Sequence, residues 1–219
     1  MSDIFREVDE EFQRDKVAQS LKKHGNLIIG VLLAVVVAVG GWRAWQYMEN
    51  QKAAEAGKAF EAALALIADG KAAEGKAALD GLAKTAPAGY RTLSRFRIAA
   101  EEARTDVAAA VKAYDALAAD TTLEASLRDL AKVRAASLQI DTLPFAELQQ
   151  KLEPLTAVGQ AWRLSAREAL GTAAFKAGQM EKASQYFDGI LADPEAPQAL
   201  RQRAEIMLSL VRGGAVQAK

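Results

Sequence analysis

The sequence predicts an all-α protein with a single N-terminal transmembrane helix followed by an α-solenoid, a domain built of helical repeats. Composition is the first reason: the chain is 51% hydrophobic but only 6% aromatic, with 5 prolines and alanine as its commonest apolar residue. Alanine has the highest helix propensity and lets helices pack closely. The other reasons are one long uncharged segment near the N-terminus and helix-ending residues that recur at similar intervals after it.

The uncharged segment covers residues 25–42, which is 18 residues. A helix of this length spans about 27 Å, close to the hydrocarbon thickness of a bilayer. Trp42, Trp45 and Tyr47 stand at its end, where such rings favour the membrane interface. We therefore expect a transmembrane anchor over residues 25–47. A buried core helix is disfavoured because the segment has no polar face, and a cleaved signal peptide because the preceding region is long and acidic.

Basic residues near the segment indicate its orientation. Five precede it and three follow within a similar distance, and the cytoplasmic flank usually carries the excess. The N-terminus is thus expected inside, which in a bacterial inner membrane places the following domain in the periplasm. Residues 1–24 would form a cytoplasmic tail, in which Ile4, Val8 and Phe12 lie on one stripe, as in a short amphipathic helix. A partly ordered tail without a specific partner is the alternative.

Small residues recur every four positions in the segment, at Gly30, Ala34 and Ala38. They lie on one face of a helix, where small side chains allow another transmembrane helix to approach closely. We interpret this face as a candidate contact with a membrane partner. The alternative is that glycine and alanine are simply common in such helices.

The remainder of the chain predicts a repeat domain over residues 48–212 and a flexible C-terminal tail over residues 213–219. Breaks at Pro87, Asp120, Pro154 and Pro194 are separated by about 33, 34 and 40 residues, close to the period of tetratricopeptide repeats. A four-helix bundle is the alternative, but it does not accommodate the helical stretches in pairs. The expected stretches are 50–68, 71–85, 88–104, 106–119, 122–139, 144–153, 159–177, 179–192 and 197–211.

The last repeat matches this pattern best. Gly171 and Ala183 are small where its two helices would cross, Gly178 occupies the turn, and Phe187 fills the space beside the crossing. The first repeat has Gly70, Gly75 and Leu79 at equivalent positions, and the second has Ala110 and Tyr114. The third, near residues 141–154, is degenerate. The stretch 197–211 has no second helix and is expected to cap the array.

No catalytic or ligand motif accompanies the repeats. The net charge is zero, which disfavours nucleic acid, and there is no cysteine. The single histidine, His24, stands at the membrane boundary and excludes histidine-based catalysis or metal binding in the repeat domain. The run from Gly70 to Ala77 resembles a phosphate-binding loop, but it has alanine where the magnesium-binding hydroxyl belongs and it follows a helix. We therefore expect that the protein is not an enzyme and that it binds no cofactor, metal or small-molecule substrate.

The acidic tail, the span ending Gly40-Gly41-Trp42 and the repeat domain closing with Leu170-Gly171, Ala183 and Phe187 together resemble a bacterial family. Its members are inner-membrane proteins with a tetratricopeptide-repeat-like periplasmic domain, and they are ancillary subunits of the Sec translocon. The opening residues 1–11 resemble the alphaproteobacterial branch. The resemblance implies a protein that helps secreted chains pass from the translocon to periplasmic chaperones, and whose tail contributes to stress signalling.

Repeat arrays bind partners along the groove formed by the first helices of each pair. On the predicted phase, the charged residues that would face this groove are Arg95, Glu102, Glu168 and Lys176. The alternative is that they lie on the solvated outer side. An organiser of envelope assembly or cell division, and a stress-signalling regulator that acts through the tail, remain alternative functions.

Overall fold

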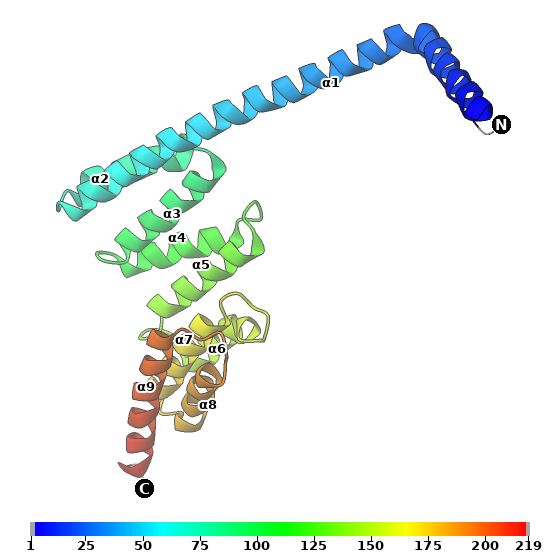
Figure 1. The fold of residues 1–219 in the computed structure, drawn as a ribbon. Coiled ribbons are helices and arrows are strands. Elements are labelled where there is room, and N and C mark those ends of the chain that lie inside the picture. The colour runs from blue at the N-terminus through cyan, green and yellow to red at the C-terminus, as the bar shows by residue number, and fades with distance from the viewer. Residues whose placement is uncertain (1–2, 218–219) are drawn as a thin grey trace. The chain divides into compact units, whose positions relative to one another are not determined.

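The computed structural model describes the backbone of residues 3–217 and the side chains of residues 27 and 29–213. Over these residues the chain forms nine α-helices, one 3-10 helix and no strand, which confirms the all-α prediction (Figure 1). The chain divides into two units, Met1–Glu55 and Ala56–Lys219. The elements are α1 (Asp3–Ala68), α2 (Ala72–Thr85), α3 (Ala88–Glu102), α4 (Val107–Ala119), α5 (Ala125–Leu138), α6 (Phe145–Leu152), η1 (Glu153–Leu155), α7 (Arg163–Lys176), α8 (Met180–Leu191) and α9 (Gln198–Gln217).

The first unit consists of the N-terminal part of α1. Every described side chain from residue 29 to residue 52 is exposed, including large apolar ones such as Leu33 at 63% and Val36 at 69%. This part of α1 is long and apolar enough to cross a membrane, and none of its apolar window is buried within the protein. An exposed apolar surface of this size is unusual on a soluble monomer, so α1 is a candidate membrane span.

The boundaries predicted around the anchor do not coincide with helix ends. No break separates residue 47 from residue 50, because the residues between them include neither glycine nor proline, and α1 runs on to Ala68. The side chains of Ile4, Val8, Phe12 and His24 lie outside the described residues. The amphipathic stripe of the tail therefore stays a prediction, as does the division of the chain at residues 24, 47 and 212.

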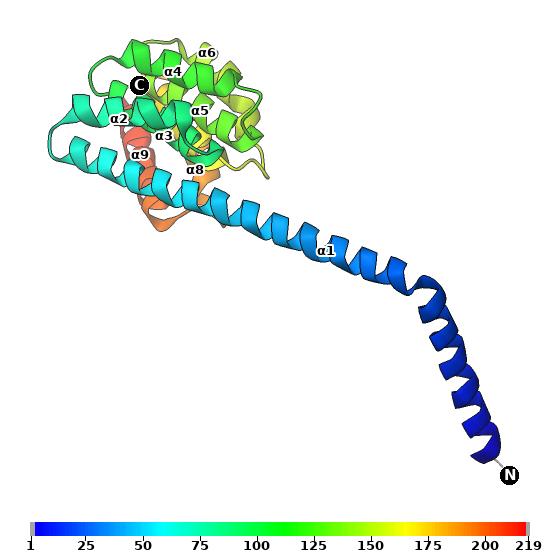
Figure 2. The ribbon, with the colours of Figure 1, turned by 90° about the horizontal axis from the view of Figure 1, so that it is seen from above.

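The second unit is an array of helix pairs, as expected. The end of α1 pairs with α2 (Figure 2), α3 with α4, α5 with α6 and α7 with α8, and each helix from α2 onward also contacts the next one along the chain. A tight turn joins the two helices of the first pair at Gly70, and another joins the two helices of the last pair at Gly178. The φ angles of these glycines are 82° and 71°. The Gly70 turn joins two helices, so the resemblance of this run to a phosphate-binding loop is a chance match.

Replacing Gly178 by alanine tests the need for glycine in this turn. Left-handed backbone is unfavourable for residues with a Cβ, so Gly178→Ala is expected to lower the free energy of unfolding by about 1–2 kcal/mol. The matched control is Gly81→Ala, since Gly81 lies within α2 with open space where a Cβ would stand. Helix propensity predicts that this control is stabilising, by about 0.5–1 kcal/mol. Urea unfolding of both variants measures the two signs.

Close contacts within the pairs occur where the sequence places glycine. A Cβ on Gly171 would stand 2.8 Å from the Phe187 ring, and one on Gly75 would stand 2.5 Å from the side chain of Ile67. Phe187 and Ala183 are fully buried. The predicted crossing of small residues beside a large one is therefore confirmed for α7 and α8, and a similar crossing occurs between α1 and α2.

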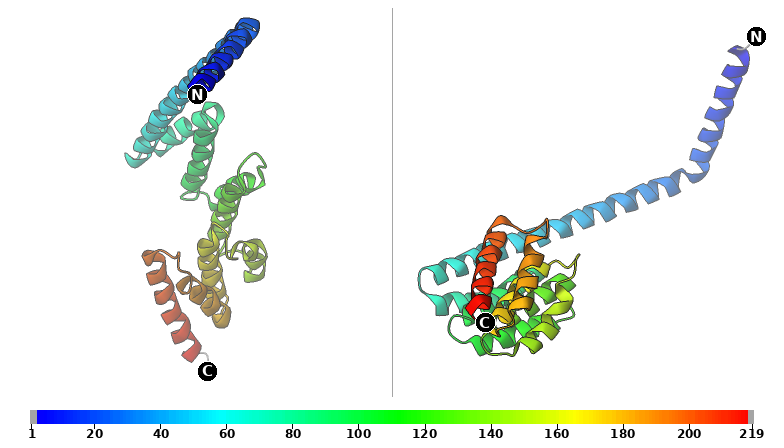
Figure 3. Two further views of the ribbon diagram at one scale, coloured as in Figure 1. Left: turned by 45° about the vertical axis from the view of Figure 1, so that its right-hand side comes forward. Right: turned by 90° about the horizontal axis from the view of Figure 1, so that it is seen from below.

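The end of the array differs from the predicted pattern in two places. Helix α7 begins at Arg163 rather than near residue 159, because a turn with Gly159 at a φ of 90° precedes it. Helix α9 packs on α8 (Figure 3) and ends at Gln217, beyond the predicted end at 211. Its outer surface is not wholly polar, since Ile206 and Leu210 are 61% and 51% exposed. The third pair is degenerate as predicted, with only eight residues in α6.

Candidate functional site

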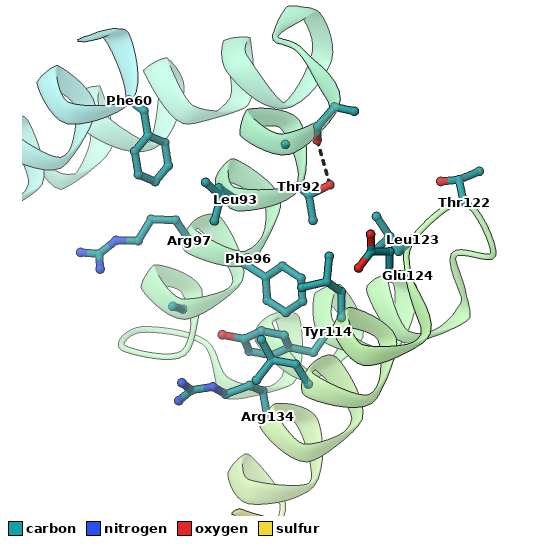
Figure 4. A pocket seen from close by; sticks show the side chains of 15 residues that line it. Phe60, Thr92, Leu93, Phe96, Arg97, Tyr114, Thr122, Leu123, Glu124 and Arg134 are labelled. Carbon is teal, nitrogen blue, oxygen red and sulfur yellow. Dashed lines mark hydrogen bonds between the residues drawn. The ribbon is translucent and has the colours of Figure 1, made fainter. Parts of the chain in front are cut away.

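A large cavity of the second unit lies between the first helices of three successive pairs. It has a volume of about 880 Å³ and is lined by the end of α1, by one face of α3 and by α5, with Tyr114 contributed by α4. Phe60, Leu93, Phe96, Leu127 and Leu130 make its wall apolar (Figure 4). Leu93 is 52% exposed, so the cavity is open to solvent. Its volume is within the range of known ligand-binding sites.

Aromatic pairs hold the wall in place. The Phe96 ring packs against the ring of the buried Tyr114, with centroids 6.1 Å apart, and Phe60 packs against Tyr90 at the same distance. Gly57 makes room for Tyr90, since a Cβ at this position would stand 2.7 Å from the tyrosine hydroxyl. Such tilted pairs add stability beyond their buried area. These contacts fix the positions of Phe60 and Phe96 in the wall.

Two arginines stand at the cavity beside the apolar wall. Arg97 pairs with Glu101 at 2.6 Å, and the side chains of Arg97 and Arg134 extend to the same side of the view as the Tyr114 hydroxyl (Figure 4). Burial raises the pKa of Tyr114, while the positive charge of Arg134 acts in the opposite direction. Glu124 is the one acidic residue in the described lining, and Figure 4 shows it on the other side, beside Leu123.

A second, more polar cavity adjoins the first. It has a volume of about 430 Å³, and Leu130 and Arg134 line both cavities. Its other walls come from α7 and from Arg203 of α9. The first helices of the pairs therefore form a surface that is apolar near α1 and α3 and polar near α7 and α9.

The predicted residues on α3 do not line the large cavity, although Arg95 lines a smaller cavity of about 440 Å³ that adjoins it. Arg95 pairs with Asp120 at 2.6 Å, and Glu102 pairs with Lys76 at 2.7 Å, so both connect α3 to neighbouring helices or their ends. Hydrogen bonds from Thr122 and Arg95 lower the pKa of Asp120 to about 2. Arg97, two residues beyond Arg95, lines the large cavity instead, about 200° around the helix.

The other predicted residues are also engaged within the chain. Glu168 lines the polar cavity, where it accepts hydrogen bonds from Arg203 at 2.7 and 3.2 Å. Lys176 pairs with Asp141. The four charged residues Arg95, Glu102, Glu168 and Lys176 are thus distributed over several junctions between elements rather than gathered in one groove. Gly30, Ala34 and Ala38 lie on the exposed part of α1, and a role in binding for all seven stays a prediction.

The apolar wall is what sequence reasoning missed. Leu93, Phe96 and Ala100 recur at intervals of three and four on α3, a spacing typical of one helix face. Such a stripe also fits ordinary core packing, and the exposure that marks it as a binding surface appears only when α1, α3 and α5 are placed in space. The predicted repeat phase selected Arg95, whereas the structure places Arg97 at the cavity.

A buried ionic cluster connects α7 to the turn before α9. Asp193 is 7% exposed and accepts hydrogen bonds from Arg163 at 2.6 and 2.9 Å and from Arg167 at 3.2 Å. The bonds from Arg163 lower the pKa of Asp193 to about 2. Arg201 donates to backbone carbonyl groups of the same turn, including that of Asp193 at 2.8 Å. Every charge in this cluster has a partner, so we interpret it as structural.

Among the described side chains, no group of three or more histidine, aspartate and glutamate residues is placed to hold a metal ion. The arrangement offers an open apolar cavity with cationic groups at one side, which suits the binding of a polypeptide segment.

Comparison with protein families gives a match over residues 19–209 to a family described as a tetratricopeptide repeat-like domain. Comparisons with curated proteins and with solved structures found no match. The match covers most of the chain, including the whole apolar segment of residues 25–42 and all four helix pairs. Repeat domains of this kind are typically non-catalytic scaffolds for proteins. The chain belongs to the tetratricopeptide repeat-like domain family.

Proposed function

We propose that this protein is a membrane-anchored scaffold that binds protein partners along the first helices of its repeats. The observation that carries the proposal is the combination, in one chain, of an exposed apolar helix and a repeat domain with an open cavity. Membership of a family of protein-binding repeats supports it. In the proposed arrangement residues 1–24 are cytoplasmic, residues 25–47 cross a bacterial inner membrane, and residues 48–212 form the periplasmic repeat domain.

The partners that we propose are the Sec translocon, at the membrane, and secreted chains or periplasmic chaperones, at the repeats. Residues Gly30, Ala34 and Ala38 would contact a transmembrane helix of the translocon, because small side chains allow close approach. A repeat domain tethered beside the translocon encounters emerging chains at a high local concentration. This arrangement favours transfer of the chain to a chaperone.

Anchoring is tested by placing charge in the span. Leu33→Arg combined with Val36→Arg is expected to move most of the protein from the carbonate-resistant membrane pellet to the soluble fraction, since each arginine costs about 2.5–3.5 kcal/mol at the centre of a span. Ile206→Arg is the matched control, because Ile206 is a similarly exposed apolar residue on α9, and it should leave the protein in the pellet. Retention of the double variant in the pellet would contradict the anchor.

Orientation is tested with single cysteines, since the chain has none of its own. A membrane-impermeant maleimide applied to cells with a permeabilised outer membrane should label Ser209→Cys, while Ser2→Cys should be labelled only after lysis. The opposite pattern would place the repeats in the cytoplasm and overturn the proposed role.

Partners are tested by photocrosslinking in intact cells from Ala34, Ala38 and Leu93. Translocon subunits are expected from the two span positions, and chaperones or secreted chains from Leu93. Crosslinks to division or cell-wall proteins alone would contradict the translocon proposal and would indicate that the protein organises the envelope.

A further inference from the structure

The large cavity has features that specify the chemistry of its ligand. Its apolar wall is only partly buried: Leu93 is exposed, and Phe60, Phe96, Leu127 and Leu130 are half-buried, so a bound ligand would cover them further. The volume of about 880 Å³ accommodates several side chains rather than one. The aromatic pairs that fix Phe60 and Phe96 reduce the ordering that a ligand must bring about. A partner with two or more large apolar side chains therefore fits the wall.

The charges at the cavity are unevenly distributed. Within the described part of the chain Arg134 is exposed and has no ion-pair partner, whereas Arg97 is paired with Glu101. Both arginines stand beside the apolar wall, while Glu124 lies on the other side (Figure 4). An arginine donor without an acceptor favours an anionic partner, and carboxylates match the guanidinium geometry.

We infer that the cavity binds a short polypeptide segment in which large apolar side chains neighbour a carboxylate. The inference rests on the proposed scaffold function and specifies its ligand. The apolar side chains occupy the wall formed by Phe60, Leu93 and Phe96, and the carboxylate accepts hydrogen bonds from the exposed guanidinium of Arg134. A segment with apolar side chains but a positive charge at this position is rejected by Arg134.

The test measures binding of labelled peptides to the full-length protein in detergent micelles. The probe is a dye-labelled ten-residue peptide with two phenylalanines and two glutamates, compared with versions in which glutamines replace the glutamates or serines replace the phenylalanines. Fluorescence anisotropy is expected to show about threefold to tenfold weaker binding for the glutamine version, and weaker binding again for the serine version. Equal affinity for the glutamate and glutamine versions would overturn the inference.

Variants at the cavity connect the preference to named residues. Leu93→Ser should weaken the binding of every peptide by roughly tenfold. Leu210→Ser, at a similarly exposed leucine on α9, should leave the affinities unchanged. Arg134→Lys should retain the preference for glutamate, Arg134→Gln should reduce it, and Arg134→Glu should reverse it toward a lysine version of the probe. Reversal identifies a direct charge contact, because a structural role for Arg134 predicts loss of binding without reversal. Thermal melting shows whether each variant remains folded.

Other outcomes separate this inference from the scaffold function. If the peptides do not bind but span crosslinks to the translocon persist, the ligand chemistry is wrong and the scaffold stands. If the peptides bind with the expected preference and the crosslinks are absent, the cavity chemistry stands and the translocon role fails. Saturable binding of dodecanoate with no binding of any peptide would make the cavity an acyl-chain site and overturn the inference.

Discussion

Phe187→Ala is expected to lower the free energy of unfolding by about 3–5 kcal/mol. The ring is 1% exposed and is in contact with Gly171, and it belongs to the largest core cluster, which connects α5 to α9. Because Gly171 of α7 has no side chain, α7 has no group at this position that could move into the volume left by the ring. Urea unfolding of the full-length chain in detergent, followed by the helical circular dichroism signal, measures the loss.

The control on the same helix is Gln185→Ala, since Gln185 is exposed, and its effect should remain within about 0.5 kcal/mol. The complementary change is Gly171→Ala, whose Cβ would overlap the Phe187 ring. Overpacking of this kind costs about 1–3 kcal/mol. Combining it with Phe187→Leu should cost less than the sum of the two single changes, because the smaller side chain makes room for the methyl group. If the two changes in the free energy of unfolding simply add, the side chains at positions 171 and 187 do not compete for the same volume.

The repeat architecture could be predicted because small residues are required where helices cross. Closely packed helices require Gly171 and Ala183 at the crossing with the Phe187 ring beside them, and the structure shows this arrangement. The boundaries were less predictable at the anchor, where no sequence signal separates the span from the first repeat helix. The start of α7 was also missed, since Gly159 turns the chain in a stretch whose composition is compatible with a helix.

The candidate cavity could be predicted only in outline. That the first helices of the pairs line a surface follows from the repeat pattern, but the side chains that face it depend on the rotation of each helix. Arg95 and Arg97 lie about 200° apart around α3, so the rotation of this helix decides which of them faces the cavity. The apolar stripe of α3 determines that rotation, but it is recognised only in the cavity that α1, α3 and α5 form together. Long-range pairing of charges, such as Glu168 with Arg203, is likewise decided by packing.

Stability is expected to fall in acid between about pH 4 and pH 2 through the cluster at Asp193. The pKa of this carboxyl is lowered from an ordinary 3.8 to about 2 by hydrogen bonds from Arg163. A lowered pKa in the folded state stabilises the fold at pH values above 3.8, and this contribution disappears as the pH falls toward 2. Arg163 and Arg167 are only 12% and 15% exposed. Protonation of Asp193 therefore leaves Arg163 with the exposed Glu195 as its carboxylate partner, and removes the carboxylate that Arg167 contacts.

Asp193→Asn isolates this contribution. At pH 7 the variant should unfold at a lower temperature than the unmodified protein, because the amide cannot balance the two guanidinium charges. The difference should shrink as the pH falls from about 4 to 2, since the unmodified protein then loses the same charge. Asp188→Asn on the exposed surface of α8 serves as the control and should remain close to the unmodified protein throughout. A difference that stays constant with pH would mean that the substituted amide disturbs packing, and that the charge on the Asp193 carboxylate does not hold α7 against the turn that leads into α9.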